Sequence, residues 1–212
     1  PAGSVLHSHN VEFREFDRDY AHARNFVPLE VLPQAEGAVF KGFKRPDGRV
    51  GTRNFISVVS TVNCSATAAR MIANAFTPEV LADYPNVDGV AAFVHGTGCG
   101  MAGDGDGFEA LQRVMWGYAR HPNFAGVLIV GLGCEVNQIP FLLDAYGLEL
   151  NNTFQTMTIQ ESGGTRKTVD GAIERITSML KPANAAVRTT VPASELTVAL
   201  HHVFNTPHDR IV

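Results

Sequence analysis

The sequence predicts an α/β fold, with a doubly wound, Rossmann-like and mostly parallel sheet of about five strands and helices on both faces. Short apolar runs alternate along the chain with segments whose apolar residues recur every three or four positions. Three of these runs end on evenly spaced cysteines, Cys64, Cys99 and Cys134, each 35 residues after the last. A repeated strand, turn and helix would therefore place all three thiols at the carboxyl edge of one sheet, where α/β proteins bind ligands.

Each element is expected from its own pattern. Apolar runs of strand length predict the sheet: 54–61, 89–94, 126–131, 154–159 and 196–200. Segments with a 3.6-residue apolar stripe predict the helices that follow the first four strands: 65–76, 107–120, 137–146 and 165–180. Ser65 is a suitable N-cap for the first of these helices. The Pro-Asp-Gly sequence at 46–48 predicts a turn before the first strand.

Composition excludes several classes of protein. The 212 residues carry a net charge of −4 with a pI near 6.1, so nothing in the charge favours a nucleic-acid partner. No run approaches the ~20 apolar residues of a membrane span, and the first residues lack the apolar segment of a signal peptide. The chain has three cysteines, an odd number, so we do not expect a framework of disulfide bonds. We expect a cytoplasmic protein whose thiols are free or bound to metal.

The cysteines allow two interpretations. Thiolates are ligands for zinc, iron and iron–sulfur clusters, and three thiolates would leave a position for substrate. A free cysteine is equally a common small apolar residue of protein cores. The close C-x-x-C pair of many metal sites is absent, so a metal site would depend on convergence of the three strands.

The loop after the second expected strand is rich in glycine. Residues 98–103 match G-x-G-x-x-G, which is typical of dinucleotide sites and suggests a nucleotide-binding oxidoreductase as an alternative function. However, Asp104 and Asp106 follow at the point where a pyrophosphate would lie, and two carboxylates oppose a phosphate there. His95, at the end of the strand, is a candidate acid, base or metal ligand; a structural hydrogen bond is the other interpretation.

Two segments could bind a carboxylate group. The turn 162–164 stands between a strand and a helix, where backbone N–H groups can bind an anion, although an ordinary capped turn has the same sequence. Arg53 precedes the first strand and could hold a carboxylate through two hydrogen bonds, although a surface arginine is the common case.

Several sequence motifs together resemble the altronate/galactarate dehydratase family, and its altronate branch most closely. The resemblance runs from about residue 38 to residue 200 and depends on many motifs rather than one. They include DGRVGTRN (47–54), TVNCSAT (61–67), YPNVDGV (84–90), HGTGC (95–99), HPNF (121–124), GLGCE (131–135) and IQESGGTRKT (159–168).

The resemblance implies a hydro-lyase that removes water from a sugar acid, giving a 2-keto-3-deoxy acid, with iron (Fe²⁺) or another divalent metal. An iron–sulfur cluster is an alternative that three thiolates allow. Such a reaction needs a base for the α-proton and an acid for the leaving hydroxyl. We assign candidate roles on this basis: His95 and Glu135 in catalysis; Arg53, Asn54, Asn63, Ser162, Gly163 and Gly164 in substrate binding; Cys64, Cys99 and Cys134 in metal binding.

The two ends of the chain depart from the family pattern. Within residues 1–36, a charged and aromatic arm, the segment 6–10 resembles the last strand of the SAF-type domain that precedes this domain in the family. Residues 37–200 are expected to form the central α/β domain, and 201–212 a divergent or truncated tail before a C-terminal dehydratase domain that is absent here. Whether this chain is active alone is therefore open. As an alternative, it is a non-catalytic subunit of a dehydratase assembly. We also predict that a homo-oligomer is possible.

Overall fold

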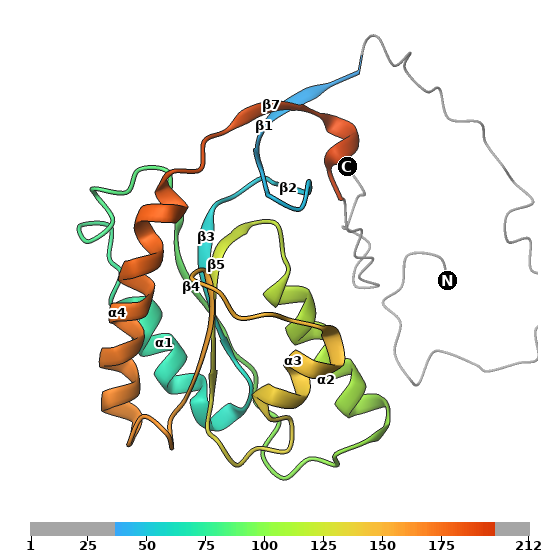
Figure 1. Cartoon of the computed structure of the whole chain (residues 1–212), viewed down its shortest axis with the longest axis vertical. Helices are drawn as coiled ribbons and strands as arrows, with labels where there is room; N and C mark the ends of the chain where they lie inside the picture. Colours follow the sequence, from blue (N-terminus) through green and yellow to red (C-terminus); the bar gives the residue numbers. More distant parts are fainter. Residues whose placement is uncertain (1–36, 198–212) are drawn as a thin grey trace, which may run out of the picture. The chain divides into compact units, whose positions relative to one another are not determined.

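A four-stranded parallel sheet lies at the centre of the part of the chain that the structure describes, residues 37–197 of a computed structural model (Figure 1). Its strands stand in the order β4-β3-β5-β6, and all three pairings are parallel. The bounds are β3 Phe55–Ser60, β4 Gly89–Phe93, β5 Phe124–Gly131 and β6 Phe154–Thr158. The predicted parallel α/β class is confirmed.

The sheet has four strands where about five were expected. Residues 198–200 of the expected fifth strand, 196–200, lie outside the described residues, as do the arm 1–36 and the tail 201–212. The described part of that segment, Leu196 and Thr197, forms no strand. The compact unit of the described chain is Ala38–Glu195.

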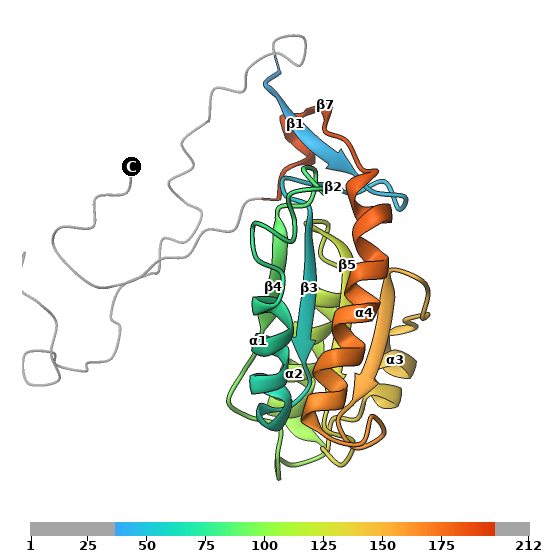
Figure 2. The ribbon, with the colours of Figure 1, turned by 90° about the vertical axis from the view of Figure 1, so that its left-hand side faces the viewer.

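Helices cover both faces of the sheet, as Figures 1 and 2 show. On one face lie α1 and α4, and on the other lie α2 and α3. Each follows the strand after which it was predicted, because the chain must cross over to start the next parallel strand. The bounds are α1 Ala66–Asn74, α2 Gly105–Ala119, α3 Ile139–Tyr146 and α4 Thr165–Asn184.

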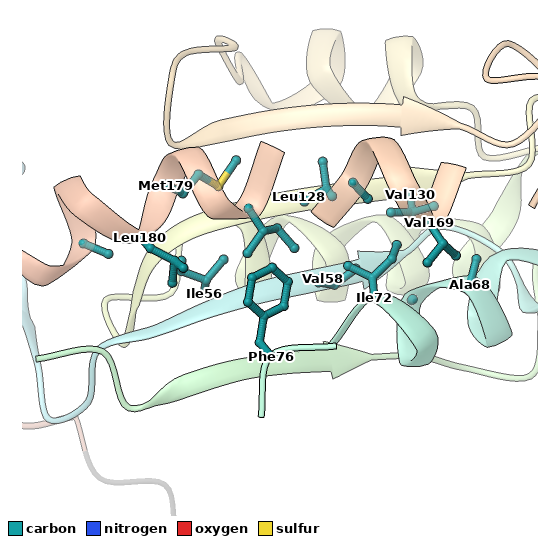
Figure 3. Close-up of a cluster of buried hydrophobic side chains, with 14 of the residues drawn as sticks. Ile56, Val58, Ala68, Ile72, Phe76, Leu128, Val130, Val169, Met179 and Leu180 are labelled. Atoms are coloured by element: carbon teal, nitrogen blue, oxygen red, sulfur yellow. The ribbon is translucent and has the colours of Figure 1, made fainter. Parts of the chain in front are cut away.

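A hydrophobic core fills the space between the sheet and the pair α1 and α4 (Figure 3). Leu128 on β5, Ile72 on α1 and Ile176 on α4 are all fully buried within it. On the other face, Met115 of α2 and Leu142 of α3 pack against the sheet. The central strands are apolar throughout because both of their faces are covered.

A small antiparallel sheet, built from segments before and after the parallel sheet in the chain, was not predicted. It has the order β2-β1-β7, with β1 at Val39–Lys44, β2 at Val50–Gly51 and β7 at Thr189–Pro192. The predicted turn at 46–48 joins β1 to β2, with Gly48 in the left-handed region at φ 87°. These strands are short, and β7 is mostly exposed, so they lack a continuous apolar run that periodicity could detect. No helix among the described residues is long and apolar enough to cross a membrane.

We expect Leu128→Ala to lower the free energy of unfolding by about 2–5 kcal/mol, because it leaves a cavity in the core between the sheet and α4. Urea denaturation of the purified chain measures the change. Leu150→Ala, at a leucine that is 53% exposed, is the matched control and should change stability by less than about 0.5 kcal/mol. Equal effects of the two substitutions would contradict the assignment of this core.

Candidate functional site

The three cysteines follow the three neighbouring strands β3, β4 and β5, at the carboxyl edge of the sheet. All three are exposed and free. The loops that carry Cys64 and Cys99 are joined by a hydrogen bond, in which the Asn63 N–H donates to the Thr97 carbonyl at 2.9 Å. Topology alone thus brings the thiols to one rim.

Gly98 allows the Cys99 loop to lie this close. Its φ of 101° is in the left-handed region, and a Cβ there would stand 3.1 Å from the Thr61 carbonyl oxygen. Because only glycine tolerates both conditions without strain, this residue fixes the approach of the loop to the segment before Cys64.

The environment of Cys64 shows that the thiols influence one another. Its pKa is raised, first by desolvation, then by a hydrogen bond with the Cys99 side chain and by the negative charge that Cys99 and Cys134 carry when ionised. The sulfur also lies 3.6 Å from the Asn63 Oδ1. Like charges disfavour a second thiolate nearby, so Cys64 ionises less readily than an isolated cysteine.

The thiol trio offers the soft donors that iron and zinc prefer. Within residues 37–197, however, no three His, Cys, Asp or Glu side chains are already arranged to hold a metal ion. The donor chemistry therefore fits a thiolate-bound metal, and metal binding would require the exposed thiols to move together. The structure places the three cysteine loops at the same edge of the sheet.

His95 lies at the same edge, with both ring nitrogens engaged. Nε2 is 3.2 Å from the Ser60 carbonyl oxygen, and the Thr97 N–H donates to Nδ1 at 3.3 Å. Because Nδ1 accepts, the proton belongs on Nε2, which donates to Ser60. The ring holds the end of β3 against the loop of Cys99, and it can act as an acid or base only if it leaves one of these bonds.

Glu135 is buried, at 4% exposure, and its carboxylate is an acceptor in every contact. Thr61 Oγ1 donates to Oε1 at 2.5 Å and the Leu132 N–H donates to the same oxygen at 3.1 Å, while the Gly133 N–H donates to Oε2. A Cβ on Gly131 would collide with Oε1, so the glycine makes room for the carboxylate.

The Glu135 contacts join two cysteine loops. Thr61 comes three residues before Cys64, and Glu135 comes directly after Cys134. With its oxygens occupied in this way, Glu135 is suited to positioning the thiols rather than to exchanging a proton with substrate. The catalytic role that the sequence analysis assigned to Glu135 stays a prediction.

The turn 162–164 has little capacity left for a carboxylate. The N–H groups of Ser162, Gly163 and Gly164 donate to carbonyls of Thr158, Gln160 and Ile159. The Ser162 hydroxyl donates to the Thr158 carbonyl at 2.7 Å. The glycines adopt φ values of 80° and 114°, which is why the sequence needs Gly-Gly here.

The first turn of α4 directly follows this turn. Its N–H groups at residues 165–167 have no partner within the helix, and no side chain caps them. Lys167 folds back over the turn, since its Nζ would lie 3.6 Å from a Cβ on Gly163. Sequence reasoning missed Lys167, although it belongs to the motif at 159–168; the indication was a basic residue in the first helical turn.

Arg53 and Asn54 lie at the other edge of the sheet, just before β3 begins. Asn54 is fully buried, accepts from Arg45 at 2.8 Å, and donates to the carbonyls of Asn86 and Ala183. The structure therefore does not bring this pair together with the cysteines, and Asn54 is used in packing. Asn63, by contrast, is exposed beside Cys64.

The glycine loop 98–103 leads into α2, whose N-cap is Asp104. Asp106 lies in the first turn of the same helix. Negative side chains stabilise a helix N-terminus, and they occupy the place that a bound pyrophosphate would take. The arrangement does not favour the nucleotide-binding alternative.

Comparison with known proteins shows which family contains this domain. The family model described as D-galactarate dehydratase/altronate hydrolase, second domain, matches residues 42–184. The chain belongs to this family. The match covers the parallel sheet and all four of its helices, so the cysteine edge lies within the family domain.

Three relatives extend the comparison. Altronate dehydratase of Bacillus subtilis (strain 168) is 29% identical over 199 residues, which are 93% of this chain and 38% of the relative. Altronate dehydratase of Escherichia coli (strain K12) is 35% identical over 147 residues, which are 69% of this chain and 29% of the relative. Galactarate dehydratase (L-threo-forming) of the same organism is 32% identical over 177 residues, which are 81% of this chain and 34% of the relative. This dehydratase-family chain thus spans less than two fifths of each.

We expect the thiol of Cys64 to react with iodoacetamide only at higher pH than an ordinary cysteine. A raised pKa keeps the proton on sulfur to a higher pH, and the thiolate is the form that reacts. Mass spectrometry of chelator-treated protein gives the rate at each pH. In Cys99→Ala the hydrogen bond and the like charge of Cys99 are both lost, so the Cys64 profile should shift to lower pH. An unchanged profile would contradict the proximity of the two thiols.

We expect Glu135→Gln to lower the free energy of unfolding by about 1–3 kcal/mol, because the amide NH₂ of glutamine would face donors that now meet an oxygen. Chemical denaturation measures the loss. Glu149→Gln, at an exposed glutamate, is the control and should change stability by less than about 0.5 kcal/mol. Equal stability of the two variants would mean that the Glu135 network contributes nothing.

Proposed function

We propose that this domain takes part in the dehydration of a sugar acid of the altronate or galactarate type to a 2-keto-3-deoxy acid. Family membership and the names of its relatives support the reaction class. The observation that carries the site is the placement of three thiols, His95 and the start of α4 at one edge of the sheet. The nucleotide-binding alternative has no such support, because two carboxylates stand at the glycine loop.

In our proposal the substrate carboxylate binds at the first turn of α4. The free N–H groups there and the ammonium of Lys167 provide hydrogen bonds and positive charge. The adjoining glycine turn is already held by its own hydrogen bonds, so it acts as a rigid support for the helix. The sugar chain would then extend from β6 toward the cysteine loops.

The proton steps fall to His95 in our proposal. Its imidazole ring carries one nitrogen that can donate a proton and one that can accept a proton. Its bonds to Ser60 and Thr97 hold it at the end of the sheet and fix the tautomer in which Nε2 carries the proton. Glu135 positions the Cys64 and Cys134 loops and makes no contact with substrate in this scheme.

We further propose that Cys64, Cys99 and Cys134 hold a divalent metal such as iron. A bound metal would polarise the substrate oxygens and help the hydroxyl to leave. Exposure of all three thiols makes them accessible to a metal ion. Free thiols in the described chain also favour a reducing compartment, for which we propose the cytoplasm.

Because the chain spans at most 38% of these relatives, binding is a more direct test than turnover. Calorimetric titration with altronate and galactarate should show saturable binding. Lys167→Gln should weaken it by about tenfold, since it removes one charge-assisted hydrogen bond. Lys41→Gln, in the antiparallel sheet, is the control and should bind as the parent does.

A sugar acid that binds equally well to the Lys167→Gln protein would contradict the proposed carboxylate site. Failure of both sugar acids to bind the parent chain would contradict the proposed substrate class.

A further inference from the structure

A cavity of about 550 Å³ lies at the amino end of the parallel strands, opposite the cysteine edge. Its walls are the turn between β1 and β2, residues 119–125 at the end of α2 and the start of β5, and the last turn of α4 with the residues after it. None of the residues assigned above to metal, substrate or catalysis borders it. The proposed dehydration therefore does not account for it.

Basic side chains outnumber acidic ones in the lining of this cavity. Lys44, Arg45, Arg49 and Arg120 line it, and Asp47 is the acidic side chain among its lining residues. The ends of α2 and α4 also face it, and each helix C-terminus carries about half a negative charge. Asp47 and two helix ends offset only about two of the four positive charges. A local positive excess thus exists in a chain whose net charge is −4.

Arg45 is fixed at the base of the cavity. Its guanidinium donates to the carbonyl oxygens of Pro122 at 2.7 Å and Arg53 at 3.1 Å, and to the Asn54 Oδ1 at 2.8 Å. These acceptors are neutral, and no carboxylate of residues 37–197 lies within ion-pair distance of it. Burial lowers its pKa, and the nearby charge of Asp47 offsets part of this effect.

The rim carries donors that a ligand could reach. Lys44 and Arg120 are exposed, and Arg120 lies 5.7 Å from the centre of the Trp116 ring. His121 accepts from the Asn123 N–H through Nδ1 at 3.2 Å, which leaves its proton on Nε2. Arg49 already donates hydrogen bonds of 2.8 and 2.6 Å to Asp47. Its main contribution to the cavity is therefore its positive charge rather than a free donor.

We propose that this cavity binds a small organic oxyanion, whose phosphate or carboxylate group is held by Lys44, Arg120 and His121 above the guanidinium of Arg45. Ammonium and guanidinium donors make their strongest hydrogen bonds with such groups. The volume lies within the range of small-molecule sites and exceeds what one phosphate group fills. The site is separate from the cysteine edge, so it binds whether or not the domain dehydrates a sugar acid.

The test is calorimetric titration of the full chain with inorganic phosphate and with succinate, at constant ionic strength set with chloride. Either anion should bind saturably, and the tighter one identifies the group that the cavity prefers. The double variant Lys44→Gln, Arg120→Gln should bind at least about tenfold more weakly, because charge-assisted hydrogen bonds are lost. The Arg113→Gln variant is the control, because Arg113 is an exposed residue of α2 that does not line the cavity. It should bind both anions as the parent chain does.

A second readout is the NMR titration of His121. Its pKa is lowered by partial burial and by the charge of Arg49, and a bound anion favours the imidazolium, so saturating anion should raise it. The signal is identified by its loss in His121→Gln. Absence of saturable binding, or equal weakening by Arg113→Gln, would overturn the proposal, as would binding that leaves the His121 titration unchanged.

Discussion

One buried carboxylate organises the candidate active edge. Glu135 accepts hydrogen bonds from the loop that leads to Cys64 and from the loop that carries Cys134, and it does so with almost no exposure to water. A buried carboxylate that lost these donors would be strongly unfavourable, so the loops and the carboxylate stabilise one another. Gly131 provides the space that this arrangement requires. The position of two of the three thiols therefore depends on this carboxylate.

The parallel sheet supplies the rest of the convergence. Its strand order places β3 between β4 and β5, so the cysteines that follow these strands are neighbours although they are far apart in the sequence. The Asn63–Thr97 hydrogen bond and the left-handed Gly98 bring the β3 and β4 loops together. The basic cavity lies at the amino end of the same sheet. The length of the strands therefore separates this cavity from the cysteine edge.

Much of this fold could be predicted from the sequence, because a parallel sheet covered on both faces produces long apolar runs. The strand around Leu128 and the helix around Ile72 are examples. The antiparallel sheet was missed, since β2 has two residues and β7 is mostly exposed. Topological reasoning also predicted the common edge of the three cysteines.

Roles were harder to predict than positions. Nothing in the sequence shows that the N–H groups of the turn 162–164 are already occupied, or that Asn54 is enclosed by Arg45, Asn86 and Ala183. Both depend on partners distant in the chain. Lys167 could have been found from its place in the first turn of a long helix. The assignment of metal to the three thiols remains a proposal.

Anaerobic loading with Fe²⁺, followed by removal of unbound metal and elemental analysis, tests the central claim most directly. We expect about one iron per chain, together with loss of most of it in Cys99→Ser, because a thiolate site needs its soft ligands. Ser162→Ala, at the edge but outside the thiol trio, should retain the metal. Iron content that is unchanged by Cys99→Ser, or absence of bound iron in the parent chain, would contradict a metal site formed by these three cysteines.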